Sequence, residues 1–345
     1  MKLSTTIGFN GDPQRLAREA QNLEAAGVDL LWSGEIYGFD LTSTLAFLAA
    51  QTERVELMTG IIPVYSRTPA LIAQTAATID ALSGGRFVLG LGTSGPQVIE
   101  GWHGVPFDKP LARTRDVIEI CRKVWSGDKL THEGRAVTLP LPADEGTGLG
   151  KPLKFMNKML RQDIPIVVAS IGPKNVALTA ELADRWQPIH FVPDRFEQVW
   201  GEALAEGGAK RSPDLGPLEI IAGGPVAIGD GPEVTEAREA ARAHIAFYVG
   251  GMGAKSKNFY NDLFKRYGWE EAAVKIQDLF LSGHRAEATA AVPDEYLDLA
   301  TLCGPEGHVR ERLEIYKEVG ITHLNVEPQG ADKLATIEKI KAWVD

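Results

Sequence analysis

The chain has 345 residues, with 46 acidic against 36 basic side chains and a formal net charge of −10. Such an acidic chain lacks the basic surface with which a general nucleic-acid binder neutralises phosphates. The two cysteines, Cys121 and Cys303, are too far apart for a CxxC metal site. The first residues lack the apolar run of a signal peptide, and no uncharged run reaches about 18 residues. We therefore expect a cytoplasmic protein with no membrane partner.

Strand-like apolar runs alternate with stretches of helical period along the whole chain. The first predicted strand covers 3–9, and the helix after it begins at Asp12 with Pro13 in its first turn and stops at Gly27. The later predicted strands are 30–32, 55–62, 87–91, 164–169, 186–192, 218–228 and 322–326. Helical patterns follow them, including 41–51, 69–82, 113–125, 308–319 and 331–344.

Eight buried strands, each followed by a helix, favour a (β/α)8 TIM barrel over the alternative, an open doubly wound sheet. Two stretches do not fit the repeating unit. The segment 127–162 follows strand four and contains a possible hairpin over 129–139. The segment 248–304 follows strand seven and is mostly helical, with glycines at 250–253 as a flexible entry. We expect one domain over 1–345 with these two insertions.

The predicted strands end mainly in Gly, Ser, Thr and Ala, and active sites of TIM barrels form at these carboxyl ends. Acid–base groups are few there, and we find no cluster of metal ligands, so we expect no metal. Small residues let a flat ligand approach the backbone closely. This composition suits a cofactor that performs the reaction itself.

Two residues at these strand ends are candidates for proton transfer. Glu35 follows strand two beside aromatic residues, and a partly desolvated carboxylate there can serve as general acid or base. A structural salt bridge is the alternative. His190 follows strand six and can protonate a substrate or bind a cofactor, or it can be a satisfied core histidine.

Two segments are candidates for binding an anion. The segment 169–175 follows a buried strand and opens a helix, so its amides, the Ser170 hydroxyl and the Lys174 ammonium can hold a phosphate. A plain helix start is the alternative. Arg67, in the loop after strand three, either contacts an anionic ligand or is solvated.

The segments 59–69, 79–87 and 90–94 resemble the luciferase-like monooxygenase superfamily, most recognisably in the Leu-Ser-Gly-Gly-Arg stretch over 82–86. The segment 169–175 is similar to the superfamily's phosphate-binding segment. One side of the superfamily uses reduced FMN and oxygen, and the other uses the deazaflavin F420 for hydride transfer. The loop after strand three and Gly92-Thr93-Ser94 look most like the F420-dependent branch.

This resemblance implies a non-proline cis peptide between Gly60 and Ile61, against the deazaflavin ring. With Arg67 added from its position, the expected cofactor-binding residues are Thr59, Gly60, Ile61, Arg67, Gly92, Thr93, Ser94, Ala169, Ser170, Ile171, Gly172, Pro173 and Lys174. The F420-dependent sugar-phosphate dehydrogenases have an acid–histidine pair where Gly34 and Glu35 stand here, and a glutamate within what is here 95–97. We therefore do not expect sugar-phosphate oxidation by their mechanism.

The sequence thus predicts an F420-dependent oxidoreductase that transfers a hydride between C5 of the deazaflavin and a small organic substrate. An FMN-dependent monooxygenase and a non-catalytic F420- or flavin-binding protein are the alternatives. The family resemblance suggests a homodimer. Because F420 has a phosphate and an oligoglutamate tail, an acidic protein must offer a local basic mouth. The candidate cations are Lys174, Arg67, Lys151, Lys154, Lys158, Lys255 and Lys257.

Overall fold

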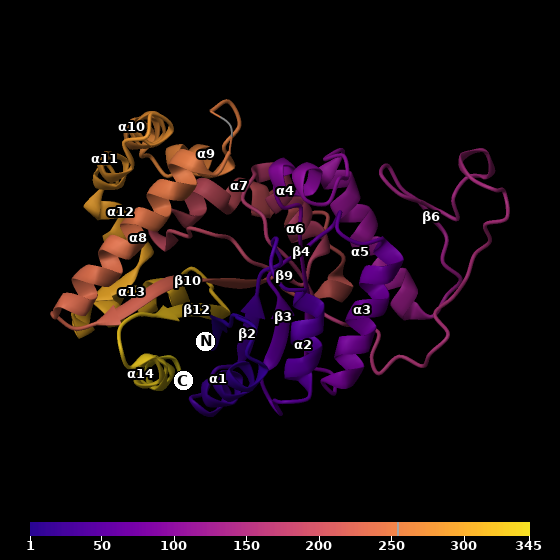
Figure 1. Ribbon diagram of the computed structural model, residues 1–345, viewed down its shortest axis with the longest axis horizontal. Coiled ribbons are helices and arrows are strands. Elements are labelled where there is room, and N and C mark those ends of the chain that lie inside the picture. Colours follow the sequence, from indigo (N-terminus) through magenta and orange to yellow (C-terminus); the bar gives the residue numbers. More distant parts are fainter. Residues whose placement is uncertain (254) are drawn as a thin grey trace.

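The computed structural model describes residues 1–253 and 255–345, and parallel strands in it close into a barrel surrounded by helices (Figure 1). The eight barrel strands are β1 (Lys2–Thr6), β2 (Leu30–Ser33), β3 (Glu56–Thr59) with its continuation β4 (Ile62–Pro63), β5 (Phe87–Gly92), β8 (Ile166–Val168), β9 (Arg185–Trp186), β10 (Glu219–Ile228) and β12 (His323–Pro328). All their pairings are parallel, and the contacts of β10 with both β9 and β12 complete the circle. The predicted (β/α)8 barrel is confirmed.

The helices that cover the barrel are α1 (Pro13–Ala25), α2 (Leu41–Ala49), α3 (Pro69–Leu82), α5 (Pro110–Ser126), α6 (Pro173–Leu182), α7 (Phe196–Gly208), α8 (Pro232–Gly251), α13 (Glu306–Glu318) and α14 (Lys333–Val344). Of these, α1, α2 and α3 begin at the predicted residues, whereas α5, α13 and α14 begin a few residues away from the predicted starts. Asp12 caps α1 by accepting the N–H groups of Gln14 and Arg15, and proline occupies the first turn. Short helical turns are α4 (Pro96–Gly101), η1 (Ala143–Glu145), η2 (Pro193–Arg195) and η3 (Pro213–Leu215).

Two apolar layers hold the barrel together. A small inner cluster fills the barrel itself and consists of Leu30, Met58, Val88, Val167 and Ile221, with Trp32 packed against it. A much larger outer cluster lies between the strands and the helices. Both faces of the strands are therefore buried, which is why β5 is buried at all six of its positions.

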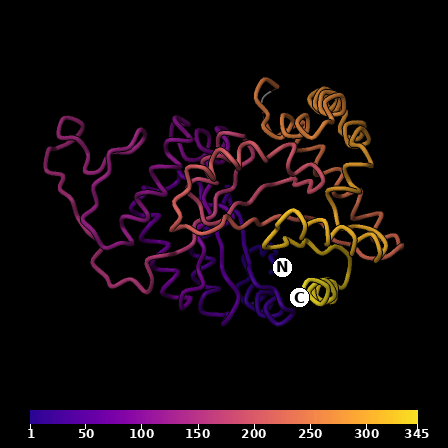
Figure 2. Tube along the Cα trace, turned by 180° about the vertical axis from the view of Figure 1, so that it is seen from behind, coloured from indigo at the N-terminus to yellow at the C-terminus, as the bar shows by residue number. Residues whose placement is uncertain are grey.

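The first insertion begins with a hairpin of β6 (His132–Glu133) and β7 (Thr138–Leu139), as predicted. The chain then runs through residues 140–162 without a barrel strand. We call these residues the arm, and it projects sideways from the barrel in both views (Figures 1 and 2).

The second insertion is helical, as predicted, although residue 254 lies outside the described residues. It contains α9 (Phe259–Arg266), α10 (Glu270–Leu281), α11 (Arg285–Ala290) and α12 (Asp294–Ala300). The expected flexible entry at 250–253 is wrong for Gly250 and Gly251, which lie in the last turn of α8. A Cβ on either glycine would stand 2.5 Å from the Phe280 side chain, so these positions are small because α10 packs closely there.

Three strand predictions differ from the structure. The predicted strand 55–62 is divided into β3 and β4 at Gly60 and Ile61, whose peptide bond is cis. The predicted strand 186–192 pairs only at Arg185–Trp186, because the chain leaves the sheet and reaches a left-handed backbone at His190, with φ of 54°. The short strand β11 (Leu302–Gly304) adds to β10 outside the barrel and was not predicted. Among the described residues, no helix is long and apolar enough to cross a membrane.

Candidate functional site

The carboxyl ends of the barrel strands and the loops after them share one face, the upper face in Figure 1, which we call the mouth. Side chains from the loops after β2, β4, β5, β8 and β9 and from the end of β12 meet there. Two residues at the mouth, Ser94 and His190, have left-handed backbones although neither is glycine, with φ of 55° and 54°. Such conformations cluster at functional sites, because the surrounding structure must enforce them.

Gly60, between β3 and β4, and the glycines of β5 allow the chain to close around the cis peptide. A Cβ on Gly60 would lie 2.5 Å from Cε3 of Trp32, and one on Gly92 would lie 2.9 Å from Cγ1 of Ile61. A Cβ on Gly90 would lie 1.6 Å from the carbonyl oxygen of Thr59. The packing of the chain against itself therefore requires glycine at these positions. The sequence alone did not indicate this reason.

Thr59 belongs to the barrel wall. It is fully buried, and its hydroxyl donates to the carbonyl oxygen of Gly90 at 2.9 Å while accepting the N–H of Gly90 at 2.8 Å. Thr93 and Ser94 follow β5 and are half-buried at the mouth, where the Thr93 hydroxyl donates to the Ser94 carbonyl at 3.2 Å.

The segment from Ala169 to Lys174 leads from β8 into α6. Gly172 is the N-cap of α6; no side chain caps the helix, and no heavy atom lies within 4 Å of where a Gly172 Cβ would stand. The Ser170 hydroxyl is buried and pairs with that of Thr179 at 2.8 Å. Lys174 is exposed beside Pro173 on the first turn. An uncapped helix start with free space beside it is suited to an anion.

A further cation at this segment, Arg266, was missed from the sequence. It comes from α9 in the second insertion, donates to the carbonyl oxygen of Ile171 at 2.6 Å and stacks on the Trp200 ring at 4.8 Å. Nothing in the local sequence indicates this contact, because 95 residues separate Arg266 from Ile171.

Glu35 and Arg67 meet on the other side of the mouth. The Arg67 guanidinium donates to both oxygens of Glu35, at 2.6 and 2.8 Å, and to Asp40 at 2.6 Å. The hydrogen bond with Glu35 raises the pKa of Arg67. One cation is thus shared by two carboxylates, so Arg67 adds no uncompensated positive charge to the mouth. The salt bridge considered for Glu35 is present.

This ion-paired group lines a pocket of about 250 Å³. Its other lining residues include Phe39, Trp102 and His103. Tyr37 and Trp102 are both about two-thirds exposed, and their rings are 6.3 Å apart. The pocket therefore combines a charged floor with an aromatic rim that is open to solvent.

His190 lies in an aromatic group with His244 and Tyr248 of α8 and Tyr260 of α9. Its ring centroid is 4.7 Å from that of Tyr248, and its Nε2 is buried with no hydrogen-bond partner among the described residues. Burial, and then the proximity of His244, lower the pKa of His190 to about 3. The imidazole is therefore neutral near neutral pH, and it can donate one hydrogen bond and accept another without carrying a charge.

The predicted basic mouth is only partly present. Lys255 pairs with Asp278 at 2.6 Å, and the Lys257 ammonium lies 6.0 Å from the centre of the Phe259 ring. The three lysines of the arm, Lys151, Lys154 and Lys158, are exposed beside the barrel. At the helix start after β8, the cations are Lys174 and Arg266.

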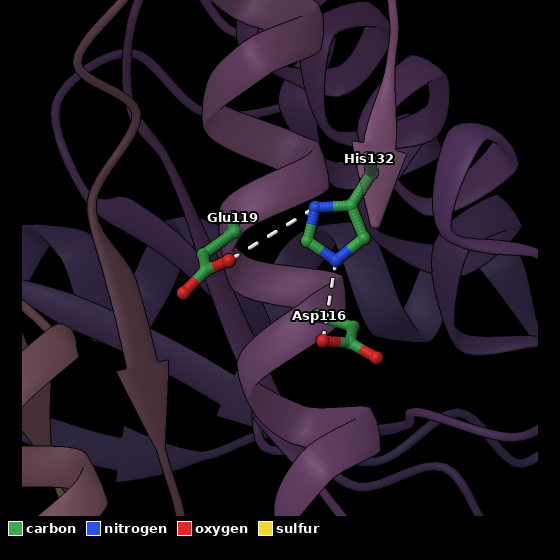
Figure 3. A group of neighbouring side chains, drawn as sticks. All are labelled: Asp116, Glu119 and His132. Atoms are coloured by element: carbon green, nitrogen blue, oxygen red, sulfur yellow. Dashed lines mark ion pairs between the residues drawn. The ribbon is translucent and has the colours of Figure 1, made fainter. Parts of the chain in front are cut away.

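One group of possible metal ligands lies outside the mouth, between α5 and the hairpin (Figure 3). Nε2 of His132 is 3.2 Å from Asp116, and Nδ1 is 3.9 Å from Glu119. The two carboxylates thus face opposite nitrogens of one ring. Asp116 also accepts the N–H groups of Ala136 and Val137. This arrangement attaches the hairpin to α5, whereas ligands of one ion would converge on a single point.

The chain is similar to known proteins over nearly its whole length. The family model described as luciferase-like monooxygenase matches residues 2–323. A Mycobacterium tuberculosis protein named as a coenzyme F420-dependent oxidoreductase is 41% identical over 341 residues, 97% of either chain. The 5,10-methylenetetrahydromethanopterin reductase of Archaeoglobus fulgidus is 30% identical over 325 residues, 92% of this chain and 90% of the reductase. The solved coenzyme F420 dependent tetrahydromethanopterin reductase of Methanopyrus kandleri shares the fold, with a TM-score of 0.76 at 23% identity over 99% of this chain and 98% of that one.

Proposed function

Because the chain belongs to the luciferase-like monooxygenase family, we propose that it is a coenzyme F420-dependent oxidoreductase. It transfers a hydride between C5 of the deazaflavin and a small organic substrate. The observation that supports this proposal most is the start of α6, where no side chain caps the helix, open space adjoins Gly172 and the cations Lys174 and Arg266 lie nearby, as a phosphate of the cofactor requires. The relative with 41% identity is named for the same cofactor.

The residues present fit such a cofactor at two places. The uncapped start of α6, with open space at Gly172 and cations at Lys174 and Arg266, would hold the phosphate. The backbone at Gly60 and Ile61 would support the ring, and the remaining predicted contacts are Gly92, Thr93 and Ser94. F420 supplies a hydride donor or acceptor when bound; the chain binds it, orients the substrate and excludes water.

We propose that Glu35 and His190 lie beside the substrate, and that the residues around each of them determine what it does there. Glu35 holds Arg67 and, through it, the loops after β2 and β4. His190 offers a neutral imidazole to the substrate or to the cofactor. Neither group brings a net positive charge to the reacting centre.

The test of cofactor choice is a fluorescence titration of the purified protein with F420 and, separately, with FMN. We expect F420 to bind and the Lys174→Gln and Arg266→Gln variants each to raise its Kd about tenfold, a loss of about 1.4 kcal/mol. Lys317→Gln, exposed in the last turn of α13, is the matched control. Binding of FMN without F420, followed by oxygen consumption with reduced FMN, would establish the monooxygenase instead. Bound F420 whose redox state no substrate changes would indicate a carrier.

We also propose one domain over 1–345, a cytoplasmic location and a homodimer. The arm supports self-association, because it exposes several large apolar side chains to solvent. These include Leu149, Leu153 and Met156, which are 83%, 66% and 94% exposed. Exposed apolar residues gathered on a projecting segment are typical of an interface.

A further inference from the structure

Glu327 lies at the carboxyl end of β12, and its side chain faces the barrel interior. Successive side chains of a strand point to opposite faces. Leu324 and Val326 belong to the outer apolar cluster, whereas Asn325 contacts Trp32 and Ser4 inside the barrel. Glu327 is two residues after Asn325, so its side chain points to the same inner face and lies nearer the mouth.

A chain of hydrogen bonds joins Glu327 to the cis peptide. The Trp32 ring packs against Gly60, and its Nε1 donates to Oδ1 of Asn325 at 2.8 Å. The Asn325 amide then donates to Oε1 of Glu327 at 3.2 Å. The orientation of the Asn325 amide is therefore set from both sides. Within the described residues, Oε2 of Glu327 has no hydrogen-bond partner.

The surroundings of Glu327 favour its protonated form more than water around a solvated glutamate would. No Lys, Arg or His forms an ion pair with it in the described part of the chain. Burial raises the pKa of Glu327, and the hydrogen bond from Asn325 offsets only part of this effect. Burial, and then the charge of Glu327, raise the pKa of Tyr248. The centroid of the Tyr248 ring lies 4.7 Å from those of the His190 and His244 rings. At Glu35, by contrast, Arg67 compensates the negative charge.

Resting on the proposed hydride transfer, we propose that Glu327 exchanges the proton with the substrate. In reduction, F420 would supply a hydride to the substrate carbon when bound, giving a new C–H bond there. The electrons of the C=O or C=C double bond move to the far atom, which takes the proton from the Glu327 carboxyl group. In oxidation, the carboxylate accepts the same proton. A proton donor is needed only where hydride addition creates an anion, so the substrate is a neutral ketone, a conjugated alkene or the matching alcohol.

The protonation of Glu327 is tested without cofactor or substrate, by infrared spectroscopy of the protein over a series of pH values that begins below the usual pKa of glutamate. The proposal predicts an absorption of a protonated carboxyl group that persists to higher pH than that of a solvated glutamate and that Glu327→Gln lacks. Glu35→Gln, which removes a carboxylate paired with Arg67, keeps this absorption. The amide in Glu327→Gln has nearly the same shape, so folding is preserved. An unchanged absorption in Glu327→Gln would overturn the proposal.

The role in the reaction is tested with reduced F420 and two neutral acceptors, acetone and 2-cyclohexen-1-one. We expect Glu327→Gln to bind F420 with nearly the wild-type Kd and to lose on the order of 100-fold or more in kcat/KM. Glu338→Gln, exposed on α14, keeps the wild-type rate. Wild-type turnover by Glu327→Gln, or no turnover of either acceptor by the wild type, would contradict the proposed role. Failure of the wild type to bind F420 would sink the proposed function, while the infrared result would still report on Glu327.

Discussion

Two glutamates at the same barrel mouth are placed in opposite electrostatic surroundings. Glu35 is buried against Arg67, whose two N–H groups compensate its charge. Glu327 is half-buried with no cation paired to it among the described residues, beside the Asn325 amide, and its partial burial raises the pKa of Glu327. The two carboxyl groups therefore differ in their partners, because Glu35 pairs with a guanidinium and Glu327 accepts a hydrogen bond from a neutral amide. Residue type alone therefore does not assign a chemical role here.

The same physics makes stability depend on pH through His323. This side chain is buried at the start of β12, and burial, aided by Arg185 and Lys2, lowers the pKa of His323 to about 3. An unfolded histidine has a pKa near 6.5, so below that pH the unfolded state binds the extra proton. The free energy of unfolding should fall as pH decreases from about 6.5 towards 3, by about 1.4 kcal/mol per pH unit for this residue.

Urea unfolding at several pH values between about 4 and 5.5, where the unfolded histidine is almost fully protonated, measures this slope. We expect His323→Gln to have a lower free energy of unfolding than the wild type. Its free energy of unfolding should also depend less on pH, by about 1.4 kcal/mol per pH unit. The exposed His284, changed to Gln, is the control and should leave the slope intact. Equal slopes for the wild type and His323→Gln would show that His323 is protonated in the folded state.

At the scale of elements, strand β5 illustrates why glycines recur in this barrel wall. Gly90 and Gly92 of β5 allow β3, β4 and β5 to converge around the cis peptide. Gly60, between β3 and β4, makes room for the Trp32 ring. The sequence interpretation connected these residues with a flat ligand. The structure shows that the wall itself needs them, so an open space for a ligand must be sought at other glycines, such as Gly172.

A matched pair of glycine variants separates these two uses. In Gly90→Ala the new Cβ would stand 1.6 Å from the Thr59 carbonyl oxygen, and backbone cannot move away cheaply. We expect the free energy of unfolding to fall by about 4 kcal/mol or more. Gly172→Ala meets no atom within 4 Å, so only the poorer N-cap preference of alanine acts, and the free energy of unfolding should fall by about 1 kcal/mol or less. Chemical denaturation checks both values, and similar losses in the two variants would refute the assignment.

On the scale of the whole molecule, the two insertions have different relations to the barrel. The second insertion returns to the mouth and contributes Tyr260 and Arg266, so it forms part of the candidate site. The arm extends sideways and exposes its apolar residues. A projecting apolar segment that stays uncovered would be an aggregation hazard, and a second copy of the chain would cover it.

Light scattering coupled to size-exclusion chromatography tests this role of the arm. We expect the wild type to have twice the chain mass and Met156→Asp to shift towards the monomer, because a buried unpaired charge opposes association. Met156 is 94% exposed in the isolated chain, so the substitution should leave the fold of the protomer intact. Lys158→Gln, a neighbouring polar change, is the control. A monomeric wild type would exclude this interface.

The alternation of strands and helices, the two insertions and the phosphate-type helix start after β8 follow from local sequence. Period, proline and glycine positions and apolar runs are properties of neighbouring residues, so the sequence displays them directly. The cis peptide followed from a family resemblance that the structure bears out.

The contacts that define the site join residues far apart in the sequence. Arg67 and Glu35 are 32 positions apart, and Arg266 and Ile171 are 95 apart. The path from Trp32 to Glu327 crosses 293 positions at its first hydrogen bond, to Asn325. Closing the barrel brings β12 beside β1, so a charge from one end of the chain comes to face groups from the other. Which charges are compensated, and which are buried alone, depends on this closure. Only the tertiary structure could therefore distinguish Glu327 from Glu35.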